Sequence, residues 1–190
     1  MPGDLMSFEF TDGPDGSTDQ AIALDGSCAV TLKCSPVDEP STVAVWFRVN
    51  QYYNPSQGDM GLLRIAGAYI TYEPAANTVY LTYEGISVES GIPSTDCSSG
   101  WHLLAVNIDT SASDQVEVYV DGELIASEDG AVPSPALAEA SIGIDVGGGF
   151  VAGDFFDFSQ WPDLKEITDL DTYQDAVVAD PDSVLPPEEA

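Results

Sequence analysis

Acidic side chains are the residues of this chain most able to do chemistry, since 33 of its 190 residues are Asp or Glu. Glycoside hydrolysis uses two carboxyl groups about 5–10 Å apart. Glu117 and Asp121 have the same strand parity, but Asp121 falls in a predicted turn. In so acidic a chain carboxylates come close by chance, and solvated surface acid is the favoured alternative. We therefore expect no catalytic carboxylate pair.

The chain has one histidine, His102, inside the apolar run Trp101–Asp109. A packed or hydrogen-bonded structural role is favoured over acid–base work. No Gly-x-Ser-x-Gly elbow offers a serine nucleophile. Gly147–Gly149 predicts a flexible loop and no phosphate cradle, because no helix follows it. We expect the protein not to be an enzyme.

Two acidic loops are candidate calcium sites. Calcium takes about six to eight oxygen ligands. One loop carries Asp12, Asp15 and Asp19, and Asp145 and Asp154 flank the glycine loop. Neither loop matches a complete calcium-binding motif, so ordinary acidic surface residues are the favoured alternative. Calcium is the one cofactor that the sequence suggests.

Three aromatic residues are candidates for sugar stacking. Tyr52 and Tyr53 fall in a polar loop that contains Pro and Gly, and Trp161 follows the last predicted strand. Packing in the core or at its rim is the favoured alternative for all three.

Charge excludes several classes of partner. Four Lys and Arg oppose the 33 acids, which gives a formal charge of −29. Nucleic acids and anionic membranes need clustered bases, and no apolar run approaches the ~20 residues of a membrane span. With 44% apolar residues the chain is core-forming. Its composition resembles that of halophilic archaeal proteins. In molar salt the Debye length falls to roughly 3 Å, which weakens the repulsion between the acidic side chains.

Helical periodicity is nearly absent, and short β-branched and aromatic runs predict an all-β fold. One domain is expected over residues 1–175, with an acidic, Pro-containing tail over 176–190. Pro162–Ile167 predicts one or two helical turns. The predicted strands are Ser7–Phe10, Ala21–Leu24, Cys28–Lys33, Thr42–Asn50, Gly61–Ala66, Tyr69–Glu73, Thr78–Tyr83, Ile86–Ser90, Trp101–Asp109, Gln115–Val120, Glu123–Ser127, Ser141–Val146 and Val151–Phe158.

Alternation within these runs predicts which faces are buried. Val43, Val45 and Phe47 share one face of their strand and Trp46 lies on the other, which suggests cover on both sides. Asp121-Gly122, between two alternating runs, predicts a type I′ hairpin turn. For Cys28, Cys34 and Cys97, buried free thiols are favoured, and a Cys28–Cys34 disulfide is the alternative.

Three segments carry a family resemblance: Ala21–Ser27, Gly100–Val106 with Val118–Leu124, and Ser141–Gly143 with Phe150–Phe158. They resemble the laminin G-like branch of the concanavalin A-like lectins and glucanases. The resemblance implies an antiparallel two-sheet jelly-roll sandwich, and calcium at a loop rim. The Glu-x-Asp-x-x-Glu strand of the enzymatic members is absent.

The resemblance implies a binding or adhesion module outside cells. The segment Met1–Leu5 has neither the basic nor the apolar region of an export signal. We therefore expect a virion surface protein of a haloarchaeal virus, such as a capsid decoration, turret, spike or tail component. It would contact other virion proteins or further copies of itself, and host glycans. The alternatives are a secreted or cell-surface haloarchaeal lectin and, more weakly, a degenerate glycoside hydrolase.

Overall fold

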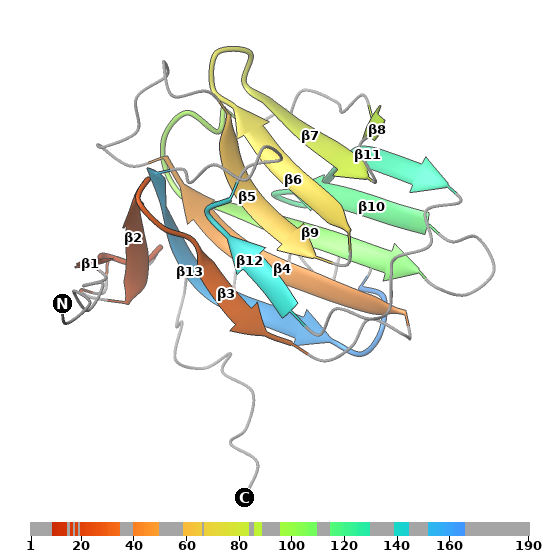
Figure 1. Ribbon diagram of the computed structural model, residues 1–190, viewed down its shortest axis with the longest axis horizontal. Helices are drawn as coiled ribbons and strands as arrows, with labels where there is room; N and C mark the ends of the chain where they lie inside the picture. The colour runs from red at the N-terminus through yellow and green to blue at the C-terminus, as the bar shows by residue number, and fades with distance from the viewer. Residues whose placement is uncertain are drawn as a thin grey trace, which may run out of the picture.

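The computed structural model describes residues 9–14, 16, 18, 20–34, 40–49, 59–65, 67–83, 86–88, 96–109, 115–129, 139–144 and 152–165. These residues form thirteen strands in two antiparallel sheets, one in front of the other (Figure 1). The predicted antiparallel jelly-roll sandwich is confirmed.

The seven-stranded sheet has the order β1-β2-β13-β4-β9-β10-β11. Its strands are Glu9–Thr11 (β1), Ala21–Asp25 (β2), Ser41–Arg48 (β4), His102–Asp109 (β9), Gln115–Val120 (β10), Glu123–Asp129 (β11) and Ala152–Trp161 (β13). The six-stranded sheet has the order β3-β12-β5-β6-β7-β8. Its strands are Val30–Lys33 (β3), Met60–Ile65 (β5), Ala68–Glu73 (β6), Thr78–Tyr83 (β7), Ile86–Val88 (β8) and Glu139–Ile142 (β12).

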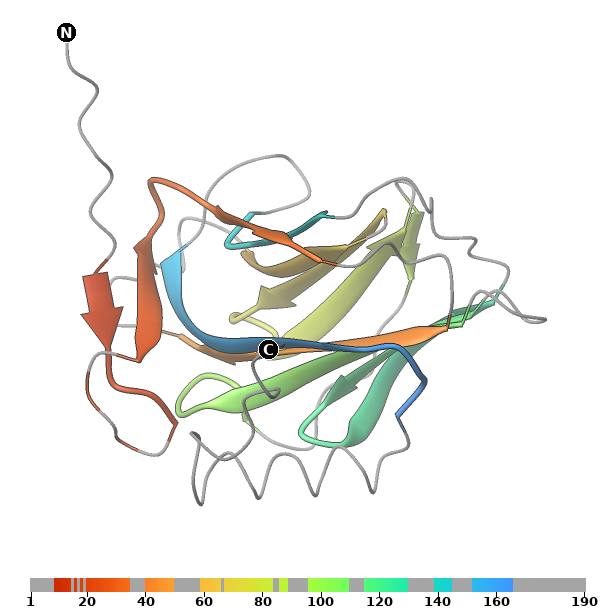
Figure 2. The same ribbon diagram turned by 90° about the horizontal axis from the view of Figure 1, so that it is seen from below.

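The two sheets face each other in Figure 2. The main core lies between them, where alternate side chains of both sheets pack together. Val43, Val45 and Phe47 of β4 point into it, as their spacing predicts. Trp46 belongs instead to a second buried cluster on the outer face of the seven-stranded sheet, with Leu103 and other residues. The expectation that β4 is covered on both sides is confirmed, because its residues from Ser41 to Phe47 are all buried.

The hairpin turn between β10 and β11 has the predicted geometry. Asp121 and Gly122 both have positive φ, 48° and 77°, as a type I′ turn requires. By contrast, β12 begins two residues and ends four residues earlier than predicted. Gly143 ends it with a φ of 76°, and a Cβ there would lie 2.3 Å from Leu24 Cδ1. The close packing of Leu24 thus needs a glycine at this position.

The segment after β13 differs from the prediction. Residues 162–165 form a bend and not a helical turn, and residues 166 and 167 lie outside the described residues. The bend crosses the outer face of the seven-stranded sheet, where Lys165 N donates to Thr42 Oγ1 (2.8 Å) and Asn107 Nδ2 donates to Lys165 O (3.0 Å). These bonds to β4 and β9 hold the backbone against the sheet, so it cannot coil locally.

The three cysteines are free, with Cys97 buried and Cys28 and Cys34 partly buried. Cys28 and Cys34 flank β3, whose extended backbone separates them. The described part of the chain contains no helix long and apolar enough to cross a membrane.

Candidate functional site

The outer face of the six-stranded sheet presents a continuous row of polar and aromatic residues. Cross-strand pairing places one residue from each of five strands in this row, in the order Thr31, Ser141, Arg64, Tyr69 and Thr82. The flanking residues Ile65, Ile70 and Leu81 point the other way and are fully buried. The row is therefore the solvent side of a strict inside–outside alternation.

A second row runs beside the first. In it Gly61, Thr71 and Tyr80 are opposed across β5, β6 and β7. A bulge at Leu62 puts Gly61 and Arg64 on the same outer face, although they are three residues apart. Tyrosine and threonine thus alternate on β6 and β7. We call Arg64, Tyr69, Thr71, Tyr80, Thr82 and Ser141 the Tyr–Thr face.

The side chains of the Tyr–Thr face differ in how exposed they are. Thr71 and Thr82 are only 4% and 7% exposed although they point away from the core, while Tyr69 and Tyr80 are partly exposed. Each threonine is directly opposite a tyrosine on the next strand. The face therefore presents two partly exposed aromatic rings, each beside a threonine that is almost completely covered.

Neighbouring groups hold the two rings in place. The guanidinium of Arg64 lies over the Tyr69 ring, 5.0 Å from its centroid. The Tyr80 hydroxyl donates to Glu73 Oε2 at 2.8 Å, and this hydrogen bond is the main reason that the pKa of Tyr80 is raised. A surface whose rings are already oriented loses less conformational entropy on binding.

The His102 side chain is buried and has an acceptor at each ring nitrogen. Nδ1 lies 2.8 Å from Asp121 Oδ2, and Nε2 lies 2.9 Å from the carbonyl oxygen of Ser99. A carbonyl only accepts, so Nε2 donates, and the Asp121 carboxylate favours a proton on Nδ1 as well. Burial lowers the pKa of His102. The hydrogen bonds to Asp121 and Ser99 together raise it by more than burial lowers it, so the net shift is upward.

This arrangement resembles a catalytic dyad but cannot act as one. Both ring nitrogens donate, so neither can accept a proton from a nucleophile. The nearby thiol of Cys97 is buried, and burial together with Asp121 and Asp96 raises its pKa to about 12. Thiolate, the reactive form, is then scarce near neutral pH. His102 instead joins the 96–101 loop to the turn between β10 and β11.

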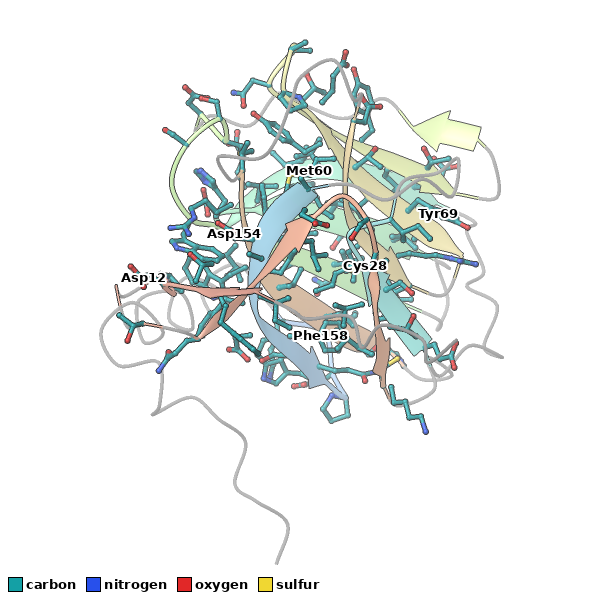
Figure 3. All side chains as sticks on the ribbon, turned by 60° about the vertical axis from the view of Figure 1, so that its left-hand side comes forward. Asp12, Cys28, Met60, Tyr69, Asp154 and Phe158 are labelled. Carbon is teal, nitrogen blue, oxygen red and sulfur yellow. The ribbon has the colours of Figure 1, made fainter. Side chains whose placement is uncertain are left out.

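Asp154, a predicted calcium ligand, is buried in an ion pair with Arg48. Arg48 Nε and Nη2 donate to Asp154 Oδ2 at 2.9 and 2.8 Å, and Nη2 also lies 3.2 Å from Thr11 Oγ1. The guanidinium lies over Trp101, 4.6 Å from the ring centroid. Figure 3 shows Asp154 well apart from Tyr69, so this pair and the Tyr–Thr face are separate features.

The other predicted site residues are dispersed. Asp12 is exposed, and among the described residues no group of three His, Cys, Asp or Glu could hold a metal ion. Trp161 packs against the second cluster, on the outer face of the seven-stranded sheet. Tyr52, Tyr53, Asp15, Asp19 and Asp145 lie outside the described residues, so a role for them, and for calcium, stays a prediction.

Sequence reasoning missed Tyr69 and Tyr80. A usable signal was present, because Tyr-x-Thr in Tyr69–Thr71 and Tyr80–Thr82 puts these residues on one face of each strand. The four-residue turn at 74–77 then sets the pairing of Thr71 with Tyr80. Only Arg64 required the structure, since the bulge at Leu62 changes its parity relative to Gly61.

No protein-family model and no curated protein matches the sequence, but several solved structures share its fold. The serotype D botulinum neurotoxin ligand-binding domain in complex with N-acetylneuraminic acid matches at TM-score 0.59 and 13% identity, over 92% of this chain and 45% of that one. A structure of botulinum neurotoxin type C, described as entering cells through two ganglioside molecules, matches at 0.62 and 12%, over 90% and 45%. Mouse laminin α1 domains LG4-5 match at 0.55 and 12%, over 74% and 40%.

This chain spans less than half the length of these structures. At such identities the likeness shows the fold alone. It agrees with the two-sheet jelly-roll sandwich that the sequence resemblance implied.

Proposed function

We propose that this chain is a non-enzymatic binding module that recognises glycans through the Tyr–Thr face. The observation that carries the proposal is the pair of partly exposed tyrosine rings, Tyr69 and Tyr80, each beside a threonine that is almost completely covered. Support comes from the fold, which is shared with proteins described as bound to N-acetylneuraminic acid or dependent on gangliosides.

The chemistry of the face suits a sugar. The apolar C–H face of a pyranose packs against an aromatic ring, and its hydroxyls need nearby donors and acceptors. Tyr69 and Tyr80 provide the rings, and the partly exposed Ser141 provides a hydroxyl that both donates and accepts. Strands hold these groups in a fixed register, so recognition needs little rearrangement of the backbone.

Replacing either ring tests the proposal. Tyr69→Ala and Tyr80→Ala are each expected to weaken glycan binding about tenfold, since each removes an aromatic contact. Binding is measured first on a glycan array and then by titration calorimetry, both in molar salt. Phe10→Ala is the matched control, because Phe10 is a 57% exposed aromatic residue on the other sheet. Absence of glycan binding by the wild-type chain would refute the proposal, as would equal losses in all three variants.

We further propose that the module lies on the surface of a haloarchaeal virus particle, where it contacts other copies or other virion proteins and presents the face to host glycans. The charge of −29 supports a saline exterior, and a binding fold suits attachment. Mass spectrometry of salt-purified particles from the source is expected to detect this chain at structural stoichiometry. Particles that lack it would contradict the placement and leave glycan binding unaffected.

A further inference from the structure

The four basic residues of this chain differ in whether they form an ion pair with an acidic residue. Arg48 is paired with Asp154 at 2.8 Å, and Lys165 with Asp163 at 3.0 Å. Lys33 and Arg64 form no ion pair in the described part of the chain. Both belong to the six-stranded sheet and point outward, Arg64 in the Tyr–Thr face and Lys33 on edge strand β3. In a protein with 33 acids, the two uncommitted cations therefore share one surface.

The surroundings of Arg64 contain no carboxylate in its own row. Its direct cross-strand neighbours are Ser141 on β12 and Tyr69 on β6. The acids of this outer face that the structure describes are further out: Glu139 is opposite Lys33, Glu73 binds the Tyr80 hydroxyl, and Asp59 acts on Tyr80. Among the described residues, Arg64 is thus the charged group at the centre of the Tyr–Thr face.

The guanidinium of Arg64 also keeps its hydrogen-bonding capacity. Its central carbon lies 5.0 Å from the centroid of the Tyr69 ring, and its N–H groups form no hydrogen bond within the part of the chain that the structure describes. Arginine presents these donors in a fork that matches the two oxygens of a carboxylate or sulfate. Because Arg64 is only partly buried, those donors can reach a ligand.

We infer that the ligand of the Tyr–Thr face is an acidic glycan, whose carboxylate or sulfate group binds Arg64 while an adjacent sugar ring packs on Tyr80. The inference rests on the proposed function and deepens it. Lys33 adds a second, more distant positive charge. Wild-type protein is expected to prefer an acidic oligosaccharide over its neutral parent by roughly 10- to 100-fold, the range of a charge-assisted hydrogen-bonded contact.

The net charge of −29 does not prevent this in concentrated salt. Repulsion from distant carboxylates acts over the Debye length, which is roughly 3 Å at 1 M ionic strength. A contact hydrogen bond between Arg64 and an anion acts within that distance. Molar salt therefore removes the long-range penalty and keeps the local attraction.

The test compares sialyllactose, sulfated lactose and lactose by titration in about 2 M NaCl, where the Debye length is shortest. Arg64→Gln is expected to abolish the preference for the two acidic sugars, and to lower the affinity for lactose by a smaller factor because the Tyr69 ring loses its contact with the guanidinium. Arg64→Lys is expected to retain part of it, and Lys33→Gln to lower it by a smaller factor. Lys165→Gln removes a cation that is already paired and should change nothing. Thermal melting of each variant confirms that it is folded.

The outcomes separate the two proposals. Equal affinity for acidic and neutral sugars, lost only in the tyrosine variants, would overturn the inference and support the proposed function. Preference for acidic sugars that survives in Arg64→Gln would also overturn it. No binding of any of the three sugars would count against both. Response to one acidic sugar alone would support the inference and identify carboxylate or sulfate as the recognised group.

Discussion

Replacing Arg48 with Met is expected to lower the free energy of unfolding by about 3 kcal/mol, although the change is on the surface side of its strand. The reason is Asp154, whose side chain is only 5% exposed and receives two hydrogen bonds from Arg48. Without the guanidinium, a buried carboxylate loses its compensating charge. Urea denaturation in constant molar salt measures the effect.

A double variant distinguishes this cause from lost packing. Arg48→Met with Asp154→Asn removes both charges, so most of the lost stability should return. Lys165→Met breaks a pair whose acid, Asp163, is 61% exposed, and it should cost less than about 1 kcal/mol. If the double variant is as unstable as Arg48→Met alone, the loss comes from the contact of Arg48 with Trp101 and not from the buried charge.

His102 is expected to make stability depend on pH. Its folded-state pKa is raised, so its contribution is complete below about pH 6.5, the ordinary histidine value, and is lost as pH rises through the folded-state pKa. Deprotonation removes one of two donors while both acceptors, Asp121 Oδ2 and Ser99 O, stay in place. His102→Gln should cost about 3 kcal/mol near pH 6.

The pH profile is the diagnostic measurement. The wild-type midpoint of urea unfolding should fall as pH is raised from about 6 to about 8, below the range in which cysteines ionise in the unfolded chain, and the profile of His102→Gln should be flat over the same window. His102 is the only histidine, so no other imidazole contributes. Parallel slopes in the two proteins would show that the pKa of His102 is the same in the folded and unfolded states, which would contradict the prediction.

Strand positions and faces follow from local sequence because period-2 alternation is a local property. Val43, Val45 and Phe47 alternate with Trp46, and this pattern predicted both clusters that enclose β4. The Asp121-Gly122 turn was predictable because few residues tolerate positive φ. The bend at 162–165 was not, because long-range hydrogen bonds to Thr42 and Asn107 decide its backbone path.

The candidate site was harder to predict because it depends on pairing between strands. Arg64 and Tyr69 are neighbours across β5 and β6, and Ser141 joins them from a strand far along the chain. The same limit applies to Asp154. Its position beside a glycine loop suggested a metal ligand, and only the pairing of β13 with β4 brings it against Arg48.

The order of strands in the seven-stranded sheet has a consequence for biosynthesis. β13, the last strand, lies between β2 and β4, and it pairs Gly153 with Leu24 and Phe155 with Phe47. A ribosome-bound chain therefore has β2 and β4 without the strand that joins them until most of the protein has been made. Such high contact order slows folding, so the core is completed only after β13 has been synthesised. Until then β2 and β4 each have an unpaired edge, and repulsion between the abundant carboxylates opposes pairing of one nascent chain with another.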